Sequence, residues 1–415
     1  MTLAGLAMIA VTGCGVWVPG AWYGAGFRVP GARTQNPAPG TVPGTQNPIP
    51  GTRQPTFDDL AKRASAAREA KRVEEALTLY ARAVKMKPSW TEGHFHLGTA
   101  AYELDRYQQA RDAFATVVRQ SPNHGTAWTL KGLCEFHLKN FDEALGDLLK
   151  GRAAGIGDNR DLVAVARYHT AILLTRVEQY EQALQVLNDF ALEGQDAPGV
   201  IEAIGIATLR LPMLPQDLPG EKREMIMMGG RAGYFMAARN MAAAKNAFEA
   251  LASRYPETPN VHYAYGVFLL SEEQDQAIEA FKRELALSPT HVWSKLQIAF
   301  ELIRRGDFEA ARPWAEQSVA EAPNLFVARK ALGQALLETG NVAGAVRELE
   351  AGVKLAPDSP ALRFTLARAY RRAGRVADAD REQAEFSRLD RIVRASRQGV
   401  QSVGGIELDS PKGRP

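Results

Sequence analysis

The sequence contains very little cysteine: Cys14 and Cys134 are the only two in 415 residues. Cys14 lies in an apolar N-terminal stretch and Cys134 lies within a predicted helix, so we expect no disulfide between them. Two thiols alone cannot assemble a metal-ligand cluster. No charge of one sign dominates either, because 50 basic residues oppose 47 acidic ones and leave a formal net charge of +3. This balance gives no overall field that would favour nucleic acid or acidic substrates.

Motifs that carry catalysis are absent as well. The sequence has no Gly-x-Ser-x-Gly elbow and no Walker phosphate loop. Its seven histidines are scattered, and His94 and His96 point to different sides of a helix because they are two positions apart. An unrecognised catalytic part would have to lie in 194–224 or in the C-terminal tail, which are too short for cores of their own. The sequence therefore predicts no metal, no cofactor and no enzymatic activity.

The N-terminal residues 1–27 carry no charged side chain. This stretch is too short and too rich in glycine for a spanning helix, and it is typical of an apolar secretory leader that lacks the usual basic start. Its segment Val11-Thr12-Gly13-Cys14 resembles a lipobox, in which Cys14 would receive lipid. The alternatives are an ordinary leader or a misassigned start.

Residues 28–56 consist mostly of Pro, Gly, Thr, Gln and Asn. With almost no large apolar side chains, this segment cannot offset the entropy of ordering, so it predicts a disordered linker. A leader followed by such a linker favours an extracytoplasmic location, periplasmic or anchored to a membrane by the N-terminus. A cytoplasmic location is the alternative.

The prolines reveal a repeat. They close successive segments at a nearly constant interval, as Pro88 and Pro122 do, and then Pro256, Pro289, Pro323 and Pro357. Small and bulky residues recur at fixed distances from them, and one copy reads Leu97-Gly98, Ala110, Phe114, Pro122. In these respects the chain resembles the tetratricopeptide-repeat family from about residue 57 to 390.

This resemblance implies an all-α fold, a right-handed superhelical solenoid of helix–turn–helix units that stack because none can bury its apolar face alone. Nine units fit, opening near residues 57, 91, 125, 164, 225, 259, 292, 326 and 360. Units 1–4 would occupy 57–193, and units 5–9 would occupy 225–390. Residues 391–415 would hold a helix extension and a disordered tail.

The segment 194–224 interrupts the period and is predicted to be an irregular junction. Within it, 200–211 predicts one apolar helix without a partner, and Pro212, Pro215 and Pro219 predict a loop. A further repeat that has diverged beyond recognition is the alternative.

In this family the first helices of the units line a concave groove, and bulky side chains at the inward positions are candidates for binding a partner polypeptide. They are Phe95, Tyr102, Phe136, Tyr168, Tyr263, Trp293, Leu296, Phe300, Ile303 and Phe364. The alternative for each of them is packing against the neighbouring unit. Some members grip a C-terminal carboxylate with paired lysine and asparagine on adjacent first helices. Here the nearest match is Lys330 with Gln334, and the following unit has Thr365 in place of the asparagine. That clamp is therefore predicted to be absent.

A second candidate surface is basic and consists of Arg368, Arg371, Arg372 and Arg375. It would dock an acidic partner or anionic lipid headgroups. The alternative is a solvated capping helix, because acidic residues are interspersed.

We therefore interpret the sequence as that of a non-enzymatic scaffold that binds another protein or peptide segment in its groove. The alternative is a membrane-associated accessory subunit of a bacterial envelope machine for secretion, assembly or polysaccharide export. These interpretations differ in the location of the protein. Neither names the partner.

Overall fold

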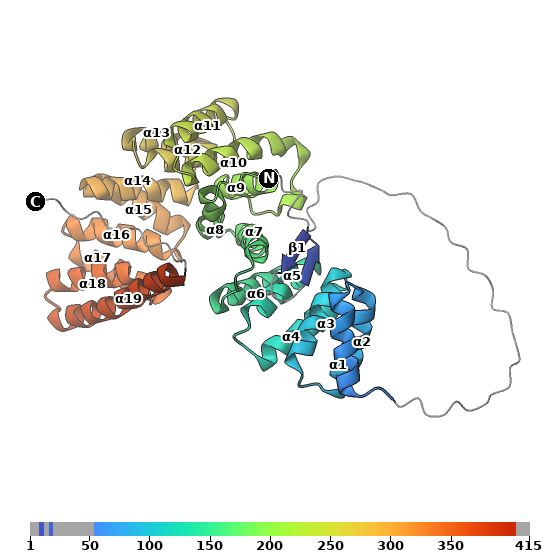
Figure 1. Ribbon diagram of the computed structural model, residues 1–415. Coiled ribbons are helices and arrows are strands. Elements are labelled where there is room, and N and C mark those ends of the chain that lie inside the picture. The colour runs from blue at the N-terminus through green and yellow to red at the C-terminus, as the bar shows by residue number, and fades with distance from the viewer. Residues whose placement is uncertain (1–7, 12–15, 20–53, 404–415) are drawn as a thin grey trace, which may run out of the picture. The chain divides into compact units, whose positions relative to one another are not determined.

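The computed structural model describes residues 8–11, 16–19 and 54–403, and helices dominate this part of the chain (Figure 1). The predicted all-α solenoid fold is confirmed. Two compact bodies are present, an N-terminal body (Met1–Ala247) and a C-terminal body (Phe248–Pro415). The division falls within helix α11 (Met241–Arg254).

The helices of the N-terminal body follow one another with short turns. They are α1 (Phe57–Glu69), α2 (Val73–Met86), α3 (Thr91–Glu103), α4 (Tyr107–Gln120), α5 (Gly125–His137), α6 (Phe141–Ala154), α7 (Arg160–Arg176), α8 (Tyr180–Leu192), α9 (Pro198–Thr208) and α10 (Arg223–Ala237). Those of the C-terminal body are α12 (Val261–Leu269), α13 (Gln274–Leu287), α14 (Val292–Arg305), α15 (Phe308–Glu321), α16 (Phe326–Glu338), α17 (Val342–Leu355), α18 (Pro360–Arg372) and α19 (Val376–Val403). The first helix of each pair starts at, or close to, an opening predicted from the period.

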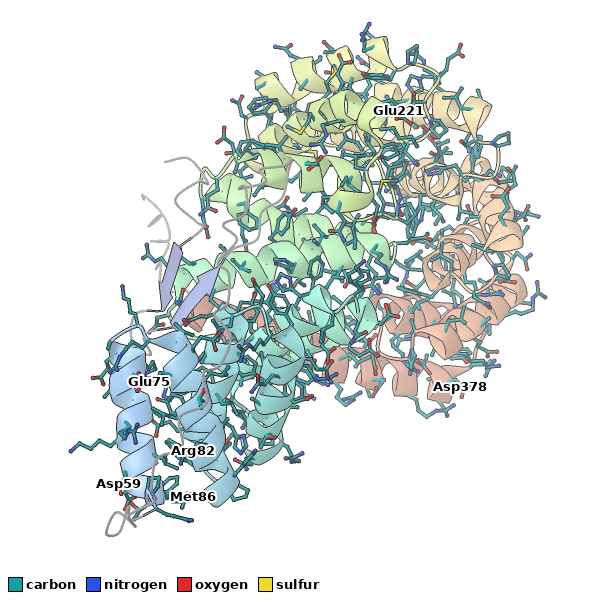
Figure 2. All side chains as sticks on the ribbon, turned by 90° about the vertical axis from the view of Figure 1, so that its right-hand side faces the viewer. Asp59, Glu75, Arg82, Met86, Glu221 and Asp378 are labelled. Atoms are coloured by element: carbon teal, nitrogen blue, oxygen red, sulfur yellow. The ribbon has the colours of Figure 1, made fainter. Side chains whose placement is uncertain are left out.

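In each body, helices pack mainly on those one or two places away along the chain, such as α5 on α6 and on α7, or α16 on α17 and on α18. Paired helices are antiparallel. Figure 2 shows Asp59, near the start of α1, and Met86, at the end of α2, at the same end of their hairpin, whereas Glu75 lies farther along it. Each body is therefore a stack of hairpins with a continuous core, as expected for repeats.

Small residues let the paired helices cross closely. A Cβ atom added to Gly98 of α3 would lie only 2.7 Å from the Phe114 ring of α4, which is completely buried. Gly333 of α16 stands in the same relation to Leu349 of α17, at 2.5 Å. The glycine position and the bulky position of the sequence period are thus in direct contact. The bulky side chain of the second helix fills the space that the missing glycine side chain leaves on the first helix.

A hydrogen bond links each of several repeats to the proline that closes the one before it. The donor is the side chain six positions after the proline, and the acceptor is the carbonyl oxygen of the proline. Trp128 Nε1 donates to Pro122 at 2.8 Å and Arg329 Nε to Pro323 at 2.8 Å. The same bond joins His94 to Pro88, His262 to Pro256 and Arg363 to Pro357. This bond ties the first helix of each of these hairpins to the proline that precedes it.

Two consecutive repeats are alike in further detail. The Arg329 guanidinium also bonds Glu348 on α17 at 2.7 Å, and the Arg363 guanidinium bonds Glu382 on α19 at 2.8 Å. Both pairs span the two helices of one hairpin, and the second pair repeats the first one period later. We refer to them as the arginine bridges. Each arginine therefore holds its partner helix and the preceding proline at once.

The predicted junction contains one helix, α9, followed by two short 3-10 turns, Pro215–Asp217 and Gly220–Lys222. The prediction that this helix lacks a partner is wrong, because α9 packs closely on α10. A Cβ atom at Gly205 would lie 2.0 Å from the Ile226 carbonyl oxygen, and one at Gly230 would lie 1.9 Å from that of Ile201. The two backbones touch where both helices carry glycine.

The predicted leader contains two strands, β1 (Met8–Val11) and β2 (Val16–Pro19), paired antiparallel with Val11 opposite Val16. In the part of the chain that the structure describes, β1 and β2 form a single two-stranded sheet. Cys14 and the predicted linker up to residue 53 lie outside the described residues, as does the tail after residue 403. Helix α19 extends past the predicted end of the repeats at residue 390.

Candidate functional site

The ten predicted groove residues differ widely in exposure. Five are buried, with at most 8% of their surface exposed: Phe95, Tyr102, Tyr168, Tyr263 and Leu296. Four are half-buried: Phe136, Trp293, Phe300 and Ile303. Phe364 is 43% exposed. The first five side chains are therefore closed off from solvent in this structure, whereas the others keep part of their surface accessible.

Histidines of the next repeat cover the buried rings of the N-terminal body. The His124 ring stacks on Phe95 with ring centroids 5.1 Å apart. The ring centroids of His137 and Tyr102 are 5.9 Å apart. His169 meets the half-buried Phe136 edge to face at 4.6 Å. These rings are packing partners between repeats, which was the alternative for each of them.

Burial keeps these imidazoles neutral at neutral pH. It lowers the pKa of His169 to about 4, although the ring also hydrogen-bonds the Val165 carbonyl oxygen at 2.8 Å, which acts in the opposite direction. Burial likewise lowers the pKa of His124 and of His137. A neutral imidazole packs against an aromatic ring without the cost of burying a charge. His124, His137 and His169 thus serve the core of the N-terminal body.

In the C-terminal body the apolar side chains of the first helices stay more accessible. Tyr263 is covered by His291, with ring centroids 4.9 Å apart, and Leu296 is buried. Trp293, Phe300 and Ile303 are half-buried at the edge of the core. Phe364 leans on Phe386 of α19 with ring centroids 5.4 Å apart and keeps much of its surface exposed.

These side chains lie on one face of three successive first helices. α14, α16 and α18 begin at positions 292, 326 and 360, so equivalent positions are one period apart. Helical periodicity places residues three, four and seven apart on one side of a helix. We call the side chains Trp293, Phe300, Ile303, Lys330, Gln334, Phe364 and Arg368 the first-helix face.

The predicted basic surface is already paired with acids. Glu338 of α16 accepts bonds from Arg368 at 2.5 Å and from Arg372 at 2.8 Å. Burial raises the pKa of Glu338, but the hydrogen bonds from both arginines outweigh it and leave that pKa below its ordinary value. Arg375 bonds Asp378 at 2.6 Å and Glu350 at 3.2 Å, and Arg371 lies 3.4 Å from Asp380. These pairs fit the alternative of a solvated capping helix.

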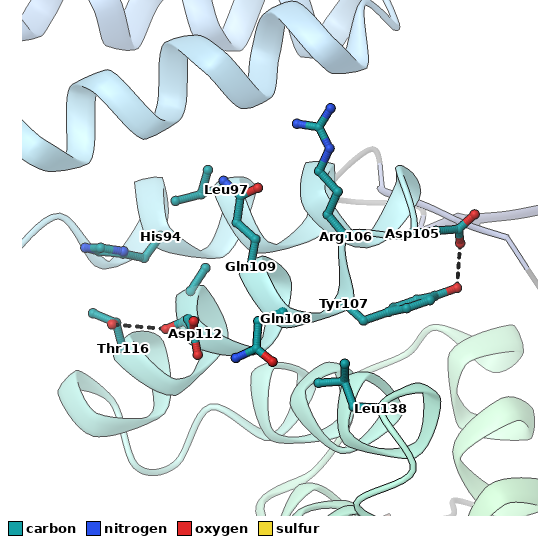
Figure 3. A pocket seen from close by; sticks show the side chains of 11 residues that line it. His94, Leu97, Asp105, Arg106, Tyr107, Gln108, Gln109, Asp112, Thr116 and Leu138 are labelled. Atoms are coloured by element: carbon teal, nitrogen blue, oxygen red, sulfur yellow. Dashed lines mark hydrogen bonds between the residues drawn. The ribbon is translucent and has the colours of Figure 1, made fainter.

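A hollow of about 800 Å³ lies along α4 in the N-terminal body (Figure 3). His94 and Leu97 of α3 line it together with Gln108, Gln109 and Asp112 of α4. At its end, Arg106 bonds Glu74 at 3.0 Å, and the Tyr107 hydroxyl donates to Asp105 at 2.5 Å. These polar groups satisfy one another, so the hollow is a weaker candidate than the first-helix face.

Chemistry-bearing groups do not converge in the residues that the structure describes. No three His, Cys, Asp or Glu side chains there form a group that could hold a metal ion. Cys134 is a free, buried thiol, and burial raises its pKa, which keeps it protonated. Within the same residues, no helix has the length and the apolar character needed to cross a bilayer.

Comparisons with known proteins agree with this architecture. One tetratricopeptide-repeat family model matches residues 95–159 and 231–292, and a second matches 302–360 and 336–382, together just over half of the chain. Human tetratricopeptide repeat protein 7B is 30% identical over 116 residues, which are 28% of this chain and 14% of that protein. This chain therefore spans a small part of that relative.

Among solved structures, similar chains include "MamA 41-end" from Desulfovibrio magneticus RS-1, with a TM-score of 0.38 and 19% identity over 40% of this chain and 96% of that one. The "MamA RS-1 ArsTM double mutant" gives a TM-score of 0.39 and 18% identity over 41% and 97%. The stacked hairpins, their glycine crossings and the matches to both family models show that this chain belongs to the tetratricopeptide-repeat family.

Proposed function

We propose that this protein is a non-enzymatic scaffold whose first-helix face binds a segment of a partner protein. Repeats of this family bind other proteins, which supports a protein partner in general terms. The observation that carries the more specific proposal is that aromatic side chains at equivalent positions of the repeats differ in how much of their surface is exposed. Phe95 and Tyr263 are closed off by a histidine of the following repeat, whereas Phe364 keeps 43% of its surface exposed.

Accessible apolar side chains on neighbouring helices favour an extended or helical polypeptide as ligand. Trp293 and Phe300 are half-buried, so a ligand would add contacts to rings that the core already orients. Such preoriented aromatic rings contribute strongly to binding, because little conformational entropy is lost when the partner arrives.

Site-specific photo-crosslinking in cells tests this proposal. A photoreactive phenylalanine analogue is placed at position 364 on the first-helix face. As the control it is placed at position 355, because Leu355 is an equally exposed apolar residue at 41% on the second helix α17. We expect a crosslinked partner from position 364 and not from 355. A partner captured from 355 alone would contradict the proposal.

A double variant tests the same face by affinity. Trp293→Ala with Phe300→Ala should remove the crosslink at position 364 in a protein that remains folded. Leu287→Ala with Leu355→Ala, two exposed residues on second helices, is the matched control and should keep the crosslink. If the first pair unfolds the protein without a selective effect on binding, these rings belong to the core and the proposal is wrong.

A second proposal places the scaffold at a membrane as an accessory subunit of an envelope machine. It rests on the uncharged residues 1–27 and the Pro- and Gly-rich 28–56 in the sequence. Cell fractionation followed by a high-salt wash tests it. Retention of the full chain with membranes, lost in a Cys14→Ser variant, would support lipid attachment at Cys14. Recovery of both proteins in the soluble fraction would contradict it.

A further inference from the structure

Lys330 is unusual among the positively charged residues on the helices. It lies half-buried on α16, and burial lowers the pKa of its ammonium group. Among the described residues it has no hydrogen bond, ion pair or ring contact. A desolvated charge without a partner costs free energy, so such an arrangement is uncommon unless a ligand completes it.

Two other lysines on first helices show how the fold treats a buried ammonium group. Lys295 of α14 is 5% exposed and bonds Glu321 of α15. Lys131 of α5 bonds Asp147 of α6. In both cases the second helix of the same hairpin supplies the carboxylate. For Lys330, the described part of the chain supplies none.

The next acid along the helix is already engaged. Glu338, two turns beyond Lys330 on α16, holds Arg368 and Arg372 together. The first-helix face therefore carries more positive than negative charge around Lys330, and an acidic ligand is its electrostatic complement.

The surroundings of Lys330 define the rest of the ligand. Gln334 follows it by one helical turn and offers an amide N–H₂ on the same side. The positions equivalent to Lys330 are Leu296 on α14 and Phe364 on α18, and α16 packs against both of these helices. The slot of Lys330 thus holds apolar side chains in both neighbouring repeats, and one of them, Phe364, is exposed.

We propose that Lys330, with Gln334 beside it, binds the carboxylate of an aspartate or glutamate side chain within the partner segment. A neighbouring apolar side chain of that segment packs on Phe364 and Phe300. This inference rests on the proposed function and makes it specific: the partner segment is acidic and apolar. Lys330 is its specificity-determining residue, because a neutral side chain in place of the carboxylate leaves the ammonium group buried and unpaired.

The binding test uses the full chain and a positional peptide library. The short peptides are acetylated and amidated, the central residue is fixed as Glu, Asp, Gln or Leu, and the other positions are random. We expect Glu and Asp pools to bind at least 10-fold more tightly than the Gln pool. Lys330→Met should abolish this preference, and Lys330→Glu should shift it to peptides with a central lysine. Lys354→Met, which removes an exposed lysine on α17, is the matched control and should change nothing.

The outcomes separate the two proposals. Peptide binding that needs Trp293 and Phe300 but shows no preference for acid would overturn the role of Lys330 and leave the proposed function intact. Binding confined to peptides with a free C-terminal carboxylate would also overturn it. If no pool binds, and position 364 gives no crosslink in cells, the proposed function itself fails.

A measurement without any ligand gives an independent test. Lys330→Met replaces an unpaired ammonium group by an apolar side chain of similar length, so the thermal unfolding midpoint should stay the same or rise. If Lys330 served to stabilise the fold, its replacement would lower the thermal unfolding midpoint. A clear fall in the midpoint would show that Lys330 stabilises the fold and would overturn the inference.

Discussion

At the scale of single residues, side chains at equivalent positions of the repeats differ in exposure. The side chains of the following repeat determine whether such a residue is buried or accessible. Phe95 and Phe364 occupy equivalent positions of their first helices. His124, at the start of the following helix, stacks on Phe95 and leaves it 7% exposed. The described helices end with α19, and Phe364 keeps 43% of its surface exposed beside it. The sequence period places a bulky residue in the slot, but its exposure depends on a side chain that belongs to the following repeat.

The buried histidines predict a specific pH dependence of stability. Burial lowers the pKa of His96 and His169 to about 4 in the folded protein, against 6.5 for a free imidazole. Below pH 6.5 the unfolded chain binds protons that the folded chain does not, so stability is full above pH 6.5 and falls toward pH 4. Each imidazole contributes at most about 1.4 kcal/mol per pH unit.

Urea unfolding of the full chain between pH 7.5 and 5 measures this effect, with His169→Gln as the comparison. Glutamine retains a donor for the Val165 carbonyl oxygen but does not titrate. Asp147 and Glu202, whose pKa values burial raises, act in the opposite sense in both proteins and cancel in the difference. The loss of stability on acidification should be shallower in the variant. Parallel curves would contradict a neutral, buried His169.

At the scale of elements, one helix depends on a cap from another. α12 begins after Asn260, whose φ of 71° is left-handed and whose side chain makes no cap bond. The fully buried Glu284 of α13 replaces that cap, because its carboxylate accepts from the backbone N–H of Asn260 at 2.8 Å and of Tyr263 at 3.2 Å. The sequence period predicts both helices and gives no indication of this bond, because it joins positions on two different helices.

Removal of that carboxylate should destabilise the C-terminal body. Glu284→Ala leaves two backbone donors without an acceptor in a buried place and should cost about 1–3 kcal/mol. Glu284→Gln keeps one acceptor oxygen and should cost less. Chemical denaturation followed by circular dichroism measures both. Equal losses in the two variants would show that side-chain volume, and not the cap, is what matters.

The contact of α9 with α10 gives a second test at this scale. Gly230→Ala places a Cβ atom 1.9 Å from the Ile201 carbonyl oxygen, so the helices must separate, at a cost of about 1–3 kcal/mol or more. Gly146 of α6 has nothing within 4 Å of an added Cβ atom. Gly146→Ala should therefore stabilise the protein by about 0.5–1 kcal/mol. Thermal unfolding of both variants compares them, and a shift in the same direction for both would contradict the close crossing.

At the scale of the whole molecule, the sequence predicts what repeats and misses what interrupts the repeat. The prolines and the glycine crossings such as Gly98 with Phe114 predict the hairpins, because each is set by contacts within one period. The partner of α9 is not predicted, because the contact of Gly205 and Gly230 is no part of the period. The unpaired state of Lys330 is not predicted either, although a charged residue in a slot held by Leu296 and Phe364 in adjacent repeats is a signal.

Hydrogen exchange should follow the position of a helix in its stack. A terminal hairpin has a neighbour on one side, and an inner hairpin has one on both, so local opening is easier at the ends. The amides of α1 and of α19 beyond Leu389, the last buried side chain described there, should exchange faster than those of α5 and α16. Mass spectrometry of the full chain measures this gradient. Uniform protection along each body would contradict a stack that is held together between neighbours.

The arginine bridges have a consequence for how this chain can grow. Arg329 and Arg363 each make the same two bonds in consecutive repeats, so the junction after Pro323 and the junction after Pro357 are held by the same donor and acceptor atoms. A second copy of residues 324–357, inserted after Pro357, could make these arginine bonds with the repeat before it and with the repeat after it. The array is open to lengthening there by duplication, and each added copy would supply one more lysine like Lys330.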